Sequence, residues 1–131
     1  MGLAYPTYYR NLFPELRTEF TTAVNVAQAA DRGVWASDVT TSGATITAVS
    51  SITDDVVVLP KLFRRLADYL QLQTGDPSLA GFRAFLAQAR DKFFILSTGH
   101  STTGLDLITE VVGGDTVRMT HAATDLVFDE K

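Results

Sequence analysis

The chain has 131 residues, 46% of them hydrophobic, which fits one soluble domain with enough apolar material for its own core. The formal net charge is −4 and the basic residues are dispersed, the tightest cluster being Lys61, Arg64 and Arg65. Nucleic acid is therefore disfavoured as a partner, because neutralising phosphates requires a basic face. The absence of cysteine excludes disulfides, thiolate metal sites and a cysteine nucleophile.

The sequence carries no recognisable signal for secretion or membrane insertion. No basic region followed by an apolar run opens the chain, and no apolar stretch reaches the length of a membrane span. We therefore expect no membrane partner and a cytoplasmic or virion-associated location.

An aromatic arm, residues 1–12, opens the chain and carries three of its four tyrosines. Aromatic side chains beside an arginine are typical of interaction hot spots, because they offer large contact area at low entropic cost. We predict that an interaction site is formed here by Tyr5, Tyr8, Tyr9, Arg10 and Phe13. In the competing interpretation Tyr8 continues the first helix and Tyr5 packs on the protein's own core.

The first helix is predicted by apolar residues at spacings of three and four, which place them on one face that we expect to be buried. They are Phe13, Leu16, Phe20, Val24 and Ala27. Residues 34–51 follow, rich in β-branched side chains. They predict two strands, 34–40 and 44–50, joined by a hairpin turn at Ser42-Gly43.

Two further helices are predicted in the middle of the chain. Apolar residues from Leu59 to Leu70 follow a helical period, with Pro60 in the first turn. The preceding residues 56–58 fit either a strand or a helical turn. Asp76-Pro77 is a typical helix start, and it predicts a third helix whose buried face carries Leu79, Phe82, Phe85, Leu86 and Ala89.

The last third of the chain predicts strands: 93–97 as a central strand, 105–112 and 116–121 as a hairpin, and 126–128 as an edge strand. The order α-ββ-αα-βββ predicts an α+β fold, with a mostly antiparallel sheet of about five strands and three helices packed on one face. No repeat or linker divides the chain, so we expect one domain over 1–131, with the arm followed by a globular core at 13–131.

Residues 97–104 carry two partial catalytic motifs. Gly99 and Gly104 have the spacing of P-loop glycines, but the two following positions lack the required lysine and hydroxyl residue. Ser101 is preceded by glycine and histidine, as in part of a nucleophile elbow, yet Thr103 stands where the second glycine belongs. We interpret the segment as a polar loop between strands.

Two histidines cannot form a three-histidine metal centre, and we predict neither a metal site nor a cofactor. Asp106 and Glu110 share one face of the strand expected at 105–112, and Arg118 lies opposite across the hairpin. A cross-strand ion pair on a solvated face is the simplest interpretation. An alternative ligand site would join these carboxylates to the polar loop through His100, Ser101, Asp106 and Glu110.

No nucleophile and base can be paired from spacing, so we expect no catalysis. The aromatic arm and the strands rich in Thr and Ser favour an interaction or assembly module, such as a structural subunit of a homo-oligomeric or virion-type complex. Its partner would be a protein, either a second copy or another chain. Two alternatives stay open: a small enzyme or ligand-binding domain that uses residues 97–106, and an acidic regulator or inhibitor of a partner protein.

Overall fold

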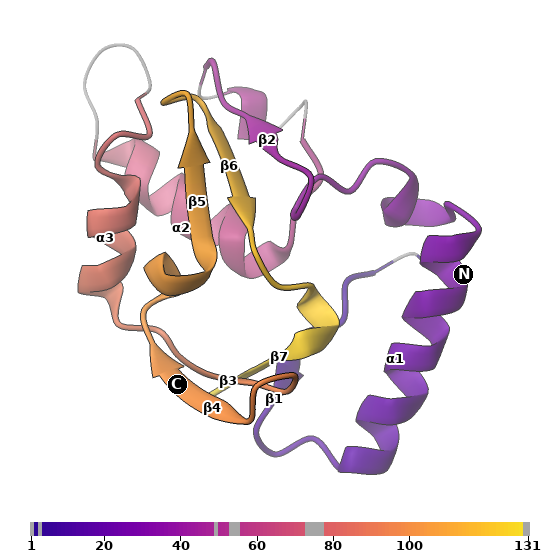
Figure 1. Cartoon of the computed structure of the whole chain (residues 1–131). Helices are drawn as coiled ribbons and strands as arrows, with labels where there is room; N and C mark the ends of the chain where they lie inside the picture. Colours follow the sequence, from indigo (N-terminus) through magenta and orange to yellow (C-terminus); the bar gives the residue numbers. More distant parts are fainter. Residues whose placement is uncertain (1, 3, 49, 53–55, 73–77, 130–131) are drawn as a thin grey trace.

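The computed structural model describes residues 2, 4–48, 50–52, 56–72 and 78–129 (Figure 1). Its three α-helices and seven strands confirm the expected α+β class, with more strands than expected and two sheets in place of one. The four-stranded sheet runs, in spatial order, through β1 (Tyr8–Tyr9), β7 (Leu126–Phe128), β3 (Lys92–Ile95) and β4 (His100–Thr103). The three-stranded sheet runs through β2 (Ala44–Thr45), β6 (Thr116–Met119) and β5 (Thr109–Val112).

Strand β7 lies inside the four-stranded sheet, so its assignment as an edge strand was wrong. It pairs antiparallel with β3 on one side and parallel with β1 on the other, where Tyr8 is in register with Val127. All three β7 residues are buried. The edge position is taken instead by the N-terminal arm, because β1 supplies the backbone partners that an edge strand would lack.

The β5–β6 hairpin is confirmed, with four antiparallel residue pairs on either side of the turn at Gly113 and Gly114. The loop between the two strands has three residues, 113–115, and both of its glycines have positive φ, which glycine adopts without steric cost. The strand expected at 105–112 is half as long as predicted, because Leu105–Ile108 form the 3₁₀ helix η3. Asp106 therefore lies on a helical turn, and the strand face that it was expected to share with Glu110 does not exist.

The hairpin expected within residues 34–50 was also wrong. Gly33–Ala36 form a 3₁₀ helix, η1, and β2 pairs with β6 instead of with residues 34–40. The physical reason is that Trp35 is buried against the first helix, which turns this segment away from any sheet. Residues 56–58 are extended: Val57 forms an isolated parallel bridge with Asp38.

Helices α2 (Pro60–Gln71) and α3 (Phe82–Ala89) cover the main core. Pro60 stands at the first position of α2, as predicted, and a leucine stripe at residues 62, 66 and 70 is buried. Helix α3 begins at Phe82, and the start predicted at Asp76-Pro77 lies outside the described residues. Among the described helices, none combines the length and apolarity needed to span a bilayer.

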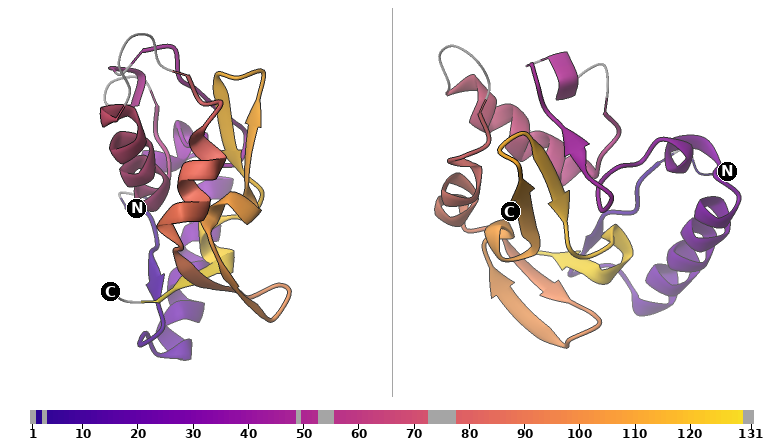
Figure 2. Two further views of the ribbon diagram at one scale, coloured as in Figure 1. Left: turned by 90° about the vertical axis from the view of Figure 1, so that its left-hand side faces the viewer. Right: turned by 45° about the horizontal axis from the view of Figure 1, so that its top comes forward.

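Helix α1 (Pro14–Ala29) lies apart from α2 and α3, as both Figure 1 and the right-hand view of Figure 2 show. Only Val24 and Ala27 of the helix are buried, in a small cluster with Trp35 that is separate from the main core. The expected burial of the whole apolar face is therefore confirmed for its second half only. Phe13, Leu16 and Phe20 are exposed.

The carboxylate of Asp38 connects three segments that are distant in the sequence. Its Oδ1 accepts hydrogen bonds from the Tyr5 hydroxyl at 2.5 Å and from Thr40 Oγ1 at 2.6 Å. Thr40 Oγ1 in turn accepts from the backbone N–H of Leu59, just before α2, at 2.8 Å. Burial and the neighbouring carboxylate raise the pKa of Tyr5, so its hydroxyl stays a neutral donor.

Replacing Asp38 should therefore weaken the fold measurably. We expect Asp38→Ala to lower the free energy of unfolding by about 2 kcal/mol, because two partly buried hydroxyl donors and one amide lose their acceptor. Urea denaturation measures this loss. The exposed Glu19→Ala on α1 is the control and should change stability by less than about 0.5 kcal/mol; equal losses in both variants would contradict the role given to Asp38.

Candidate functional site

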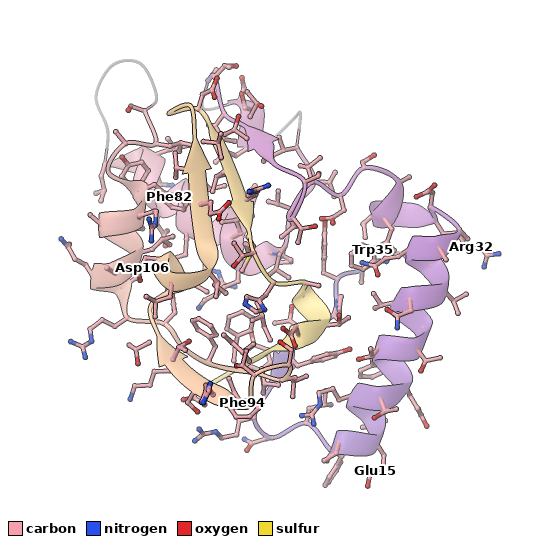
Figure 3. All side chains as sticks on the ribbon, in the orientation of Figure 1. Glu15, Arg32, Trp35, Phe82, Phe94 and Asp106 are labelled. Atoms are coloured by element: carbon pink, nitrogen blue, oxygen red, sulfur yellow. The ribbon has the colours of Figure 1, made fainter. Side chains whose placement is uncertain are left out.

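A groove of about 410 Å³ lies between the N-terminal arm and α1, and we call it the α1 groove. The arm contributes one wall, including Tyr5, Pro6 and Tyr8, and Trp35 of η1 completes the lining beside the helix (Figure 3). The helix contributes Phe20, Ala23, Val24 and Ala27. None of the described residues that line this groove has a charged side chain, which gives it the apolar character typical of binding sites.

The arm is held against its own chain at two tyrosines. Tyr8 is almost fully buried, and its hydroxyl lies 2.6 Å from Thr21 Oγ1 on α1. The ring of Tyr5 packs edge-on against Trp35, with ring centroids 5.0 Å apart. The intramolecular interpretation thus describes how both tyrosines pack, although Tyr8 does so from a strand and not from the predicted helix.

The other three residues of the predicted interaction site face outward. Tyr9 and Phe13 are exposed, and the exposed Arg10 forms an ion pair with Asp129 at 3.0 Å. The structure therefore divides the predicted set: Tyr5 and Tyr8 shape the α1 groove from within, and Tyr9, Arg10 and Phe13 remain accessible.

Helix α1 presents an exposed apolar stripe beside the groove. Phe13 is 70% exposed, Leu16 38% and Phe20 46%. Together with Val26 they make up four of the nine large exposed hydrophobic residues in the described part of the chain, so exposed apolar surface is concentrated on this helix. The threonine hydroxyls of α1 do not offset this apolar character. Those of residues 18, 21 and 22 donate hydrogen bonds to backbone carbonyls of their own helix.

The packing beneath the groove is incomplete in one respect. Trp35 is 8% exposed, yet its indole Nε1 is buried without a hydrogen-bond partner in the described chain. Buried polar groups are nearly always paired, because an unpaired donor carries a desolvation cost. The small cluster around Trp35 thus contains a buried hydrogen-bond donor without a partner in the described chain, which is unusual in a protein interior.

The residues of the alternative ligand site are distributed over separate elements. His100 and Ser101 lie on the exposed strand β4 of one sheet, whereas Glu110 lies on β5 of the other. Glu110 forms the predicted cross-strand ion pair with Arg118, at 2.6 Å. The backbone carbonyl of Asp106 accepts hydrogen bonds from the side chain of Arg83 on α3.

The glycines of the partial motifs have structural explanations. Gly104 has a φ of 101°, and a Cβ atom there would collide with the carboxylate of Asp106. Gly99, also at positive φ, ends the turn of the β3–β4 hairpin, so the segment 97–104 is a turn followed by a strand. Gly99 thus serves the β-hairpin and Gly104 precedes the 3₁₀ helix η3, and within the described residues no α-helix follows that could orient a phosphate or a nucleophile.

A cluster that the sequence analysis missed joins Ser97, His121 and Asp125. The carboxylate of Asp125 accepts from the backbone N–H and the hydroxyl of Ser97, at 2.8 and 2.6 Å, and lies 2.7 Å from Nδ1 of His121. These residue types build catalytic triads, but there the histidine stands between serine and carboxylate. Here the carboxylate is central, so the cluster has the connectivity of a loop anchor.

Burial acts to raise the pKa of Asp125, but the hydrogen bonds from Ser97 and His121 outweigh it and hold the pKa below its ordinary value. Nothing in the sequence spacing signals this cluster, because 28 residues separate Ser97 from Asp125. Within the described ranges, no three His, Asp or Glu side chains gather as a metal site. No protein-family model, curated protein or solved structure shows significant similarity to the chain.

The anchoring role of Asp125 predicts a pH-dependent stability. We expect Asp125→Asn to lower the free energy of unfolding by about 1 kcal/mol at about pH 5 and above, because an amide cannot accept from all three donors. Since the folded-state pKa lies below the ordinary value of 3.8, this contribution is lost as the pH falls through the folded-state pKa. Urea denaturation at a series of pH values should show the difference from wild type shrinking in strong acid.

Glu110→Gln provides the control for Asp125→Asn, because it breaks an ion pair that is about half exposed on both sides. Its cost should stay below about 0.5 kcal/mol. The free energy of unfolding should differ less between wild type and Asp125→Asn in strong acid. If the difference persists unchanged there, the charge of Asp125 does not stabilise the loop.

Proposed function

We propose that this chain is a non-catalytic interaction module that self-associates, and that two copies meet through the exposed face of α1 and the α1 groove. The observation that carries the proposal is the apolar stripe at residues 13, 16, 20, 24 and 27, which is exposed over its first half and lines the groove over its second. Exposed apolar surface of this kind on a helix is typical of an interface.

The stripe has the symmetry that a twofold dimer requires. Its spacings of three, four, four and three residues read the same in both directions from Phe20. When two such helices pack antiparallel about a twofold axis at Phe20, Phe13 lies opposite Ala27 and Leu16 lies opposite Val24 of the second copy. Each contact then repeats twice, as in an isologous interface.

The symmetry also places large side chains opposite small ones. Phe13 and Leu16 project from the accessible half of the stripe, whereas Val24 and Ala27 lie in the wall of the α1 groove. The groove of one copy can therefore receive Phe13 of the other, and reciprocally. None of the described stripe or groove side chains is charged, so docking of these residues buries no unpaired charge.

The size of this face predicts a reversible dimer. Helix α1 has 16 residues and is about 24 Å long, and a buried phenylalanine contributes roughly 150–250 Å². The face therefore lies at the lower end of specific interfaces, which bury about 800 Å² per partner. We expect a dissociation constant in roughly the micromolar range.

An enzyme is supported less well. In the Ser97–Asp125–His121 cluster the histidine contacts the carboxylate and not the hydroxyl, and the polar residues 100, 101, 106 and 110 are spread over three elements. An acidic regulator is also supported less well, because many of the described carboxylates are already paired, including those of Asp91, Glu110, Asp125 and Asp129.

Light scattering over a concentration series tests the proposal. We expect the mass of wild type to rise with concentration toward twice the 14.3 kDa of one chain. Phe13→Ser and Phe20→Ser should hold it at the mass of one chain, whereas Leu107→Ser, which changes a residue 60% exposed on η3, should leave association unchanged. A wild type that stays monomeric to about 1 mM would refute self-association. Point variants are preferable to removing residues 1–12, which would also remove β1.

Cysteine cross-linking tests the geometry, because the natural chain has no cysteine. Phe20→Cys places one thiol beside the predicted twofold axis, where two copies approach within the roughly 7 Å between Cα atoms that a disulfide allows. Mild oxidation should link this variant into dimers much faster than Leu107→Cys. Equal rates for the two variants would refute the antiparallel arrangement.

A further inference from the structure

A second pocket, of about 190 Å³, lies where α2 begins beside β1, β3 and β7, and we call it the basic pocket. Among the described residues, its lining has four cationic and two carboxylate side chains, an excess of two positive charges in a chain whose net charge is −4. The cations are Lys61, Arg64 and Arg65 of α2 and Lys92 of β3. The α1 groove shares no residue with it.

The inner part of the basic pocket is a closed ion-pair network around Asp91, which is 5% exposed. Arg65 donates to both carboxylate oxygens, with Nε and Nη2 each 2.7 Å away, and Lys61 Nζ lies 2.9 Å from Oδ1. Burial acts to raise the pKa of Asp91, but these two cations outweigh it and lower the pKa, so the carboxylate stays charged. Lys61 and Arg65 are thus fixed in place.

The outer part of the basic pocket carries donors without acceptors. The side chains of Arg64, Lys92 and Tyr9 are exposed, and none forms a hydrogen bond or ion pair within the described chain. The remaining carboxylate, Asp129, is already paired with Arg10 at 3.0 Å. Unused donors therefore converge on one small volume whose acceptors are occupied.

The electrostatics of α2 point to a missing anion. Lys61, Arg64 and Arg65 all lie in its first two turns, and the first turn contains no acidic residue. The N-terminus of a helix carries the positive end of its macrodipole, so cations there are unfavourable and anions are stabilised. The buried Asp91 and the exposed Asp68, which lies 3.2 Å from Arg65, compensate only part of this positive charge.

A neighbouring pocket of about 300 Å³ shares Lys92 and Asp129 with the basic pocket. It adds the hydroxyl side chains of Ser101 and Thr103 on β4. This lining suits a polar group with hydroxyls of its own, because hydroxyl side chains both donate and accept.

We propose that the basic pocket binds the phosphate group of a small polar phosphate monoester. Arg64 and Lys92 supply charge-assisted hydrogen bonds to the phosphate oxygens, and the Tyr9 hydroxyl supplies a further one. The volume of about 190 Å³ is below that of pockets for drug-sized ligands, which fits a single phosphate group. The neighbouring pocket holds the polar remainder of the ligand beside Ser101 and Thr103.

Calorimetric titration with inorganic phosphate and with glycerol 3-phosphate tests this site in low-salt buffer. Arg64→Gln and Lys92→Gln should each weaken binding about tenfold, and the double variant should abolish it. Arg32→Gln removes the same charge at the far end of α1 and should change the affinity less than about twofold (Figure 3). Both test side chains lack partners, so thermal unfolding without ligand should be unchanged and a loss of binding cannot be ascribed to misfolding.

Ser101→Ala combined with Thr103→Val distinguishes the source of the phosphate. We expect this double variant to bind glycerol 3-phosphate more weakly than wild type and to bind inorganic phosphate with unchanged affinity. If both probes bind with equal affinity, and the Ser101→Ala/Thr103→Val double variant changes neither affinity, free phosphate is the ligand of the same pocket. No saturable binding of either probe, or equal binding by wild type and the Arg64→Gln/Lys92→Gln double variant, would overturn the proposal.

Discussion

The insertion of β7 between β1 and β3 links the N-terminal arm to the main sheet. A three-residue strand that is buried throughout needs hydrogen-bonding partners on both edges, and the N-terminal arm provides the second of them. Pairing of Tyr8 with Val127 then places Tyr5 against Trp35. The arm, η1 and α1 consequently form a second, smaller cluster whose open side is the α1 groove.

Three aspartates organise the connections between these elements. Asp38 joins the arm to the start of α2, Asp91 joins α2 to the start of β3, and Asp125 joins the β3–β4 turn to the segment before β7. Each accepts several hydrogen bonds, at least one of them from a group distant in the sequence. Such charge-assisted bonds give loops a defined conformation where the short strands supply few backbone bonds.

Both proposed sites have side chains whose interactions are unsatisfied within the described chain, but the unsatisfied interaction differs between them. At the α1 groove it is hydrophobic: half of an amphipathic face stays in solvent, and the indole N–H of Trp35 has no partner in the described chain. At the basic pocket it is electrostatic, since Arg64 and Lys92 are free at the positive end of a helix. Natural sequences tend to depart from local rules at functional sites, and both surfaces show such a departure.

Elements whose signals are local could be predicted from the sequence. Helical periodicity located α1 and α2, Pro60 marked the start of α2, and the glycine pair at 113–114 located the β5–β6 hairpin with its Glu110–Arg118 ion pair. These features depend on residues a few positions apart, so spacing and turn chemistry suffice to predict them.

Only the tertiary structure decided which strands pair and which apolar faces are covered. Residues 34–40 have strand-like composition, yet burial of Trp35 on α1 turns them into a 3₁₀ helix and a loop. Likewise, periodicity put Phe13 and Ala27 on one face but could not show that one is exposed and the other buried. Burial and strand pairing are set by contacts between segments far apart in the chain, whose free energy outweighs local propensity.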